Sequence, residues 1–95
     1  MTLHNLKILP EHYEAVTHFN PLKRKTVEIR REDDREFAVG DVLHLNEWDA
    51  EANRFTWRSS SFVVTHILRG APFVPEGYAA LSITPMALRK ELSYD

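Results

Sequence analysis

The chain has 95 residues, of which 43% are hydrophobic and 27% charged; it carries a net charge of −2 and contains no cysteine. This length favours a single domain over residues 1–95. Without cysteine there is no disulfide framework and no zinc site built on sulfur, and the charge balance excludes the basic surface of a nonspecific DNA coater. The longest apolar run has four residues, 78–81, so we expect no membrane span and a cytoplasmic location.

The first predicted elements are a strand and a short helix. Residues 3–9 alternate between two faces, which is typical of a strand. Pro10 and Glu11 indicate a helix start, because proline fits the first helical position and an acidic residue suits the first turn. The expected helix has about two to three turns and contains Tyr13, Val16 and Phe19.

A second strand is predicted over residues 25–31, with Val27 and Ile29 on its apolar face. The opposite face carries Thr26, Glu28 and Arg30. A hydroxyl, a carboxylate and a guanidinium side by side make a recognition surface, because arginine presents a planar fork to a phosphate or a base edge. The alternative, which spacing alone favours, is a solvated strand face with cross-strand ion pairs.

The third strand is predicted over residues 42–48. Leu43 and Leu45 share a face with Glu47, because every second residue of a strand points the same way. This carboxylate therefore lies at the end of a core-facing stripe.

The second half of the chain is predicted to be mostly extended. Residues 55–69 form one or two strands, and residues 78–84 form the last one. The apolar face of the longer segment is expected to carry Phe62, Val64, His66 and Leu68. Pro85 opens a short helix in the tail, residues 85–95. Together these elements indicate an α+β fold, a barrel-like domain of about five strands with two small helices.

Three motifs in a fixed order give the chain a family resemblance. They are His4-x-Leu6-Lys7-Ile8, Lys25-Thr26-x-Glu28-x-Arg30 and Asp34-Arg35-x-Phe37-x-Val39-Gly40-Asp41-x-Leu43-x-Leu45-x-Glu47-Trp48-Asp49. Through them the chain resembles the DUF3850 family, small bacterial and phage proteins of the ASCH, PUA-like superfamily, over residues 3–84. The resemblance implies a PUA-like β-barrel of five to six strands with two short flanking helices.

For function, the resemblance implies a cleft that binds RNA or a modified nucleotide. The matching positions expected to contact the nucleic acid are Lys7, Lys25, Thr26, Glu28, Arg30, Arg35 and Glu47. For Glu47 an equal alternative is a buried carboxylate that pairs with a basic residue and fixes the barrel.

The chain departs from the family pattern at two places. Residues 20–24 stand where the family has a glycine before the second strand, so the loop that enters the cleft differs in shape. Trp57 stands where a glycine is expected. Its indole is either a stacking surface for a base or an aromatic side chain of the core or of an edge strand.

Hydrolysis and protein docking are the alternatives to binding. The related N4-acetylcytidine amidohydrolases use a threonine three residues after the lysine, but here that position is Glu28, and alternation puts Thr26 opposite to Lys25. A ribonuclease would use Glu28 as a general base, with Lys25 and Arg30 as cationic stabilisers. A protein-interaction module would dock through residues 47–51 and the tail helix.

The five histidines are scattered and form no i, i+4 pair. Since metal sites on one element need such spacing, we expect no metal and no cofactor. His4 and His66 share faces with aliphatic residues, so we expect both at the edge of the core.

Overall fold

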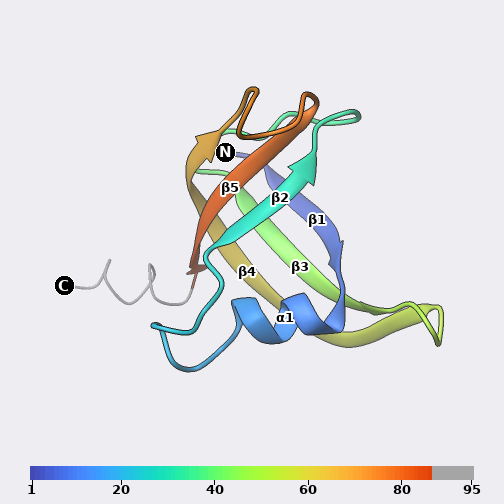
Figure 1. The fold of residues 1–95 in the computed structure, drawn as a ribbon. Helices are drawn as coiled ribbons and strands as arrows, with labels where there is room; N and C mark the ends of the chain where they lie inside the picture. The colour runs from blue at the N-terminus through green and yellow to red at the C-terminus, as the bar shows by residue number, and fades with distance from the viewer. Residues whose placement is uncertain (87–95) are drawn as a thin grey trace.

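The structure is a computed structural model, and it describes residues 1–86. Along this part of the chain (Figure 1) the elements are β1 (Leu3–Ile8), α1 (Pro10–Val16), β2 (Val27–Arg31), β3 (Val42–Asp49), β4 (Arg54–Leu68) and β5 (Tyr78–Pro85). Pro85 still belongs to β5, and residues 87–95 of the expected tail helix lie outside the described residues. None of the described helical segments has the length and apolarity that a membrane crossing requires.

The five strands form one curled sheet with the order β1-β3-β4-β5-β2. β1 pairs with β3 in parallel, and the other neighbours pair antiparallel. β1 and β2 are the edges of this sheet, and its curl leaves an opening between them, which we call the seam (Figure 1). The sheet is therefore a half-barrel, and the prediction of a small, mostly β, barrel-like fold is confirmed at this level.

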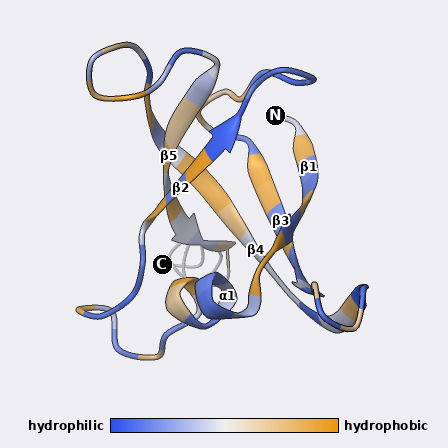
Figure 2. Cartoon of the chain, turned by 45° about the vertical axis from the view of Figure 1, so that its right-hand side comes forward, coloured by the Kyte–Doolittle hydropathy of each residue, from blue (hydrophilic) through white to orange (hydrophobic). Residues whose placement is uncertain are grey.

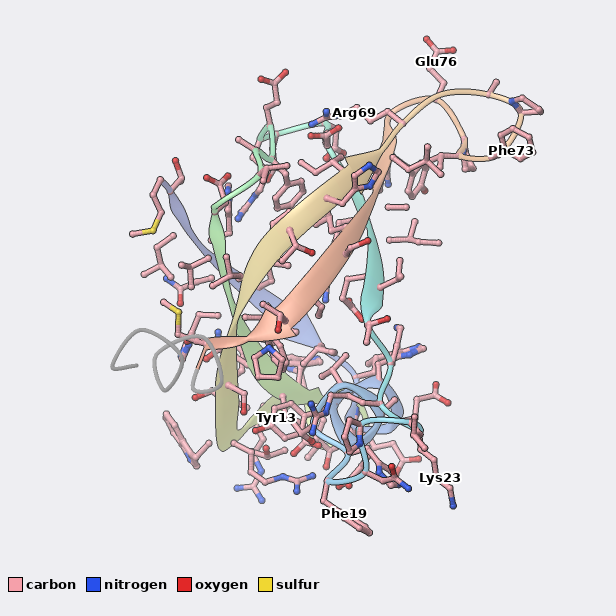
Figure 3. All side chains as sticks on the ribbon, turned by 90° about the vertical axis from the view of Figure 1, so that its left-hand side faces the viewer. Tyr13, Phe19, Lys23, Arg69, Phe73 and Glu76 are labelled. Carbon is pink, nitrogen blue, oxygen red and sulfur yellow. The ribbon has the colours of Figure 1, made fainter. Side chains whose placement is uncertain are left out.

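Helix α1 lies at one end of the half-barrel, directly after β1 (Figure 1). Pro10 stands at its first turn, and the inward-facing side chains of Tyr13 and Val16 are buried. The helix ends three residues before Phe19, which is 89% exposed and points outward (Figure 3). Thr17 is the C-cap of the helix, and both its backbone N–H and its hydroxyl donate to the Tyr13 carbonyl.

The core fills the concave side of the sheet, as strand alternation requires. Its fully buried side chains are Leu43, Leu45, Leu81, Val16 and Val64. Figure 2 shows hydrophobic residues in the central parts of β3 and β4 and mostly hydrophilic residues in the loop that follows β2. The predicted core-facing stripe of β3 is confirmed, and Glu47 at its end is only 3% exposed.

A register shift in β4 corrects the face predicted for this strand. Phe62 and Val64 are buried as expected. Between Val64 and His66 the pairing with β5 shifts, and such a bulge turns the following side chains to the other face. Ile67 therefore packs against the core, whereas His66 and Leu68 are exposed, and the prediction of a core-edge role for His66 is wrong.

Candidate functional site

The inward face of β2 carries charge. Glu28 is 4% exposed, whereas Val27 and Ile29 are 39% and 61% exposed. The apolar face predicted for this strand therefore points outward, and the strand face that carries Glu28 is not solvated. β2 is an edge strand, so its inward side faces the seam instead of a packed neighbour. A carboxylate buried there needs compensating partners.

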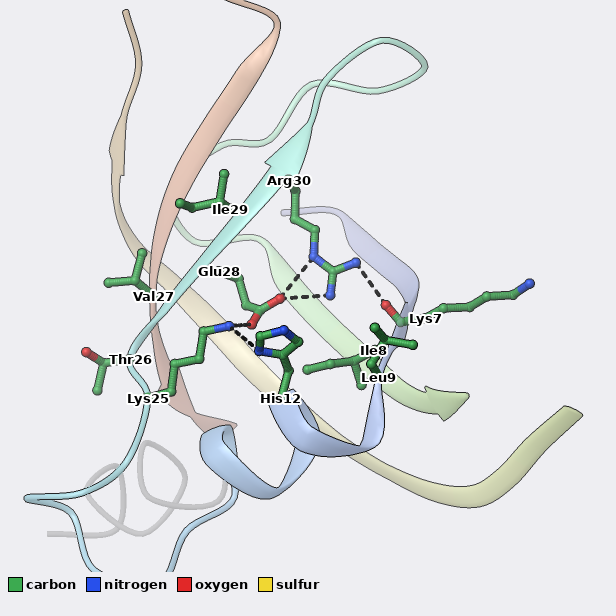
Figure 4. A pocket seen from close by; sticks show the side chains of 10 residues that line it. All are labelled: Lys7, Ile8, Leu9, His12, Lys25, Thr26, Val27, Glu28, Ile29 and Arg30. Atoms are coloured by element: carbon green, nitrogen blue, oxygen red, sulfur yellow. Dashed lines mark hydrogen bonds and ion pairs between the residues drawn. The ribbon is translucent and has the colours of Figure 1, made fainter. Parts of the chain in front are cut away.

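Two cations compensate Glu28 (Figure 4). Lys25 Nζ donates to Glu28 Oε2 over 2.8 Å, while Arg30 donates to Oε1 from Nε over 3.0 Å and from Nη2 over 2.8 Å. Arg30 Nη1 also donates to the Lys7 carbonyl over 2.9 Å and so ties β2 to β1 across the seam. Both oxygens of Glu28 are occupied, and the carboxylate holds the two cations in fixed orientations.

Lys25 and Thr26 exchange the places that alternation predicts for them. β2 begins only at Val27, and before it the Lys25 backbone N–H donates to the Ala15 carbonyl of α1. This anchor places the Lys25 side chain beside Glu28. The Thr26 side chain is exposed and points away from the charged groups (Figure 4). The inward trio is thus Lys25, Glu28 and Arg30, and the expected grouping of Thr26 with Glu28 is wrong.

Helix α1 contributes His12, which the sequence analysis did not single out. Its Nδ1 lies 3.2 Å from Lys25 Nζ. An ammonium group can only donate, so Nδ1 accepts and the proton of a neutral ring sits on Nε2. No histidine spacing marks His12, and the only signal is its place in the first turn of the helix that follows β1.

These side chains line one open pocket of about 720 Å³, which we call the seam pocket (Figure 4). Its lining consists of Lys7, Ile8, Leu9, His12 and the six residues from Lys25 to Arg30. The volume lies in the range of small-ligand sites. Two cations face one carboxylate, so the ionised groups of the inward trio sum to a charge of +1.

Two predicted site residues turn their side chains elsewhere. Lys7 reaches the seam pocket only with its backbone carbonyl, while its side chain points away (Figure 4) and its Nζ lies 3.9 Å from the centroid of the Trp48 ring. Arg35 Nη1 lies 3.4 Å from His4 Nδ1, and Arg35 Nε lies 3.7 Å from an Asp34 oxygen. Arg35 does not line the seam pocket, although it borders a neighbouring pocket of about 340 Å³ together with Arg30.

Glu47 belongs to a separate cluster with Arg58. Arg58 donates to it from Nε over 2.9 Å and from Nη2 over 2.8 Å, and the Thr56 hydroxyl donates over 2.6 Å. Hydrogen bonds from Arg58 and Thr56 hold the pKa of Glu47 below its usual value although burial opposes the shift. Arg58 also donates to Glu14 of α1 over 2.7 Å and lies over the Tyr13 ring. This geometry matches a carboxylate that fixes the helix to the sheet.

His4 and Asp41 form a second buried pair. His4 Nε2 lies 2.9 Å from Asp41 Oδ2, and the backbone N–H groups of Thr2 and Ala38 donate to the same carboxylate. Burial raises the pKa of Asp41, but the hydrogen bonds from His4, Thr2 and Ala38 outweigh it and lower the pKa. The expected place of His4 at the core is confirmed.

Over residues 1–86, no three His, Asp or Glu side chains gather in a way that would hold a metal ion.

Trp57 is not a core aromatic, since its side chain is 90% exposed. It lies in the first part of β4, which pairs with β3 alone because the pairing with β5 begins at Phe62, and this position matches the edge-strand alternative. Its φ is +74°, a region that bulky residues rarely occupy. The stacking role stays a prediction.

The fold and the site together define a small half-barrel protein with a charged pocket at the seam between its two edge strands. The chain belongs to the DUF3850 family, because the family model described as "Domain of unknown function (DUF3850)" matches residues 3–83. The resemblance stated for residues 3–84 is thus confirmed at the level of the family. The search of curated proteins found no match to this chain.

Proposed function

We propose that this chain binds RNA or a nucleotide in the seam pocket, as an ASCH domain with a PUA-like barrel. The observation that carries the proposal is the inward trio of Lys25, Glu28 and Arg30, in which a buried carboxylate orients two cations at the wall of an open pocket. Cations held in fixed positions beside a cavity form a preorganised site for an anion. The motif that contains these three residues is also the one that implies nucleic-acid binding by resemblance.

The hydrogen-bond donors left in the pocket suit a phosphate group. A guanidinium carries five N–H groups and an ammonium three. Arg30 directs three of them to Glu28 and Lys7, and Lys25 directs one each to Glu28 and His12. This leaves two N–H groups of Arg30 and one of Lys25 for a ligand. The positive charge of the trio attracts an anion to the same donors.

The apolar part of the lining suits the sugar or the base. Ile8 and Leu9 border the charged trio in the seam pocket. Small-ligand sites commonly combine an apolar wall with a few polar groups that fix the orientation. A nucleotide matches this pattern, since its phosphate pairs with the cations while its ring systems pack against carbon.

A ribonuclease is the second candidate function, and the contact between His12 and Lys25 favours it. Both Glu28 oxygens are engaged, so His12 is the better placed group for moving a proton beside the two cations. Amide hydrolysis has no comparable support, because Thr26 points away from them (Figure 4). Cleavage of labelled RNA that is lost in His12→Gln would favour the nuclease, whereas RNA that stays intact would favour simple binding.

The binding proposal is tested by titrating a labelled single-stranded RNA of about eight nucleotides with the wild type, Arg30→Gln and Arg31→Gln. Arg31 is the matched control because its side chain is 66% exposed and pairs with Asp33 outside the trio. We expect Arg30→Gln to weaken binding about tenfold and to make the plot of log affinity against log salt less steep by about 0.7. Equal effects of the two substitutions, or no binding by the wild type, would refute the proposal.

A further inference from the structure

We propose a second site on the outer face of the sheet, where the Trp57 indole stacks on an unpaired base of the bound RNA. The inference rests on the proposed function and adds that the ligand is a single strand of several nucleotides rather than a mononucleotide. The site, which we call the outer site, is a shallow pocket of about 360 Å³ lined by Asn5, Asn46, Phe55, Trp57, Arg58 and Ser59.

The conformation of Trp57 is the first support. The indole is 90% exposed, and its φ of +74° is strained for a bulky residue. The pairing of β3 with β4 shifts register between Asn46 and Trp48, next to the stretch that carries Trp57. Such an irregularity re-aims a side chain, and strained residues cluster at ligand sites. The result is a flat aromatic surface open to solvent, which every base can stack on.

Hydrogen-bonding groups surround this surface. Asn46 Nδ2 donates to the carbonyls of Leu6 and His44 over 3.3 and 3.2 Å, so the amide is fixed and Oδ1 is the group it can offer to a base N–H. Asn5 and Ser59 line the same pocket. Bases carry donors and acceptors on their edges, whereas an apolar protein segment would leave these polar groups unpaired. The surroundings of Trp57 therefore favour a base.

Lys7 connects the outer site with the seam pocket. Its carbonyl accepts from Arg30 in the seam pocket (Figure 4). Its ammonium group lies 3.9 Å from the Trp48 ring centroid and 5.8 Å from that of Phe55. The strand order places β3 between the edge strand β1 and the part of β4 that carries Trp57, so an RNA strand that leaves the seam pocket crosses β1 and β3 to reach the indole. It passes the Lys7 cation on this path, and none of the six residues that line the outer site is acidic.

The test compares an RNA of about eight nucleotides with uridine monophosphate in titrations of the whole chain. The variants are Trp57→Gly, Arg30→Gln and, as the control, Phe73→Gly, which removes another aromatic side chain that is 84% exposed, on the loop before β5 (Figure 3). We expect Trp57→Gly to lower the affinity for the longer RNA at least about fivefold more than the affinity for the mononucleotide. Phe73→Gly leaves both affinities unchanged, and Arg30→Gln weakens both.

A fluorescence measurement tests the outer site without removing Trp57, so it does not depend on a loss of affinity in a variant. Trp48→Phe leaves Trp57 as the sole tryptophan, since the chain has two, and stacking on it quenches its emission when the longer RNA is added. Wild-type affinity in Trp57→Gly, or emission unchanged on saturation, overturns the outer site; if Arg30→Gln still weakens binding, the proposed function stands. If the wild type binds neither ligand, both proposals fail. Quenching by an apolar peptide but not by RNA would also overturn the outer site.

Discussion

Lys25 Nζ lies 2.8 Å from Glu28 Oε2, although residues three positions apart would point to opposite faces of a regular strand. The pair forms because β2 starts only at Val27 and the Lys25 backbone is held by the Ala15 carbonyl of α1. The helix therefore positions the cation that the strand alone would direct away. This arrangement turns the inward side of an edge strand into the wall of a charged pocket.

Glu28→Gln is predicted to lower the free energy of unfolding by about 1–3 kcal/mol. The substitution removes the carboxylate that separates the Lys25 and Arg30 cations, and the two like charges then repel each other. Urea unfolding of the variant measures the loss. Glu76→Gln is the matched control, since Glu76 lies exposed on the loop before β5 (Figure 3). An unfolding free energy equal to that of the control variant would contradict the role assigned to Glu28.

Glu47→Gln is predicted to destabilise the protein by about 1–2 kcal/mol without changing its affinity for RNA. The substitution removes the charge-assisted hydrogen bonds from Arg58, which joins the sheet to Glu14 of α1. Thermal unfolding and the RNA titration are measured on the same sample. A loss of affinity at full stability would instead place Glu47 in the binding site.

The ion pair between Glu32 and Arg69 is predicted to make the free energy of unfolding depend on pH in the acid range. Arg69 donates to Glu32 over 2.7 and 2.8 Å and lowers the pKa of this carboxyl from 4.5 to about 2. Because the folded-state pKa is depressed, the stabilisation is fully present above pH 4.5 and is lost as the pH falls toward 2. Arg69 is half-exposed, so solvent screening reduces the contribution to about 1 kcal/mol.

Glu32→Gln provides the measurement for this pair. The unfolding free energy of the variant should be lower than that of the wild type by this amount at neutral pH, and the difference should disappear as the pH falls through about 2. A difference that stays constant across this range would show that the carboxylate charge does not contribute.

Trp57→Gly is predicted to stabilise the protein by about 1 kcal/mol. Glycine adopts positive φ without strain, and the exposed indole contributes little packing. Phe73 has no positive φ, so Phe73→Gly is expected to destabilise by about 0.5–1 kcal/mol. Differential scanning calorimetry of both variants shows whether each substitution raises or lowers the stability. A loss of stability in Trp57→Gly would contradict the claim that the backbone of Trp57 is strained.

Much of the fold follows from alternation and from proline and glycine positions. The stripe of Leu43, Leu45 and Glu47 on β3 is predicted in full, because the register shift between Asn46 and Trp48 puts the extra residues in β4 and leaves the alternation of β3 intact. The face of β4 is predicted only up to Val64, since the bulge that follows depends on the pairing with β5 and leaves no local signal. Local pattern thus predicts each strand until its partners shift the register.

The candidate site is predicted only in part, because its geometry depends on contacts between distant elements. The motif marks Lys25, Glu28 and Arg30, but alternation assigns Lys25 to the wrong face because strand propensity does not include the contact with α1. His12 joins the site through the packing of that helix against the seam. No sequence rule predicts this packing, since it depends on the curl of the whole sheet.

The most direct test of the central claim is an NMR titration of the labelled chain with the single-stranded RNA and a panel of nucleosides that includes N4-acetylcytidine. The account predicts that amide shifts cluster on residues 7–9, 12 and 25–30, which line the seam pocket, at concentrations where the loop over residues 70–77 does not respond. Shifts confined to that loop, or no shifts at saturating RNA, would contradict the account.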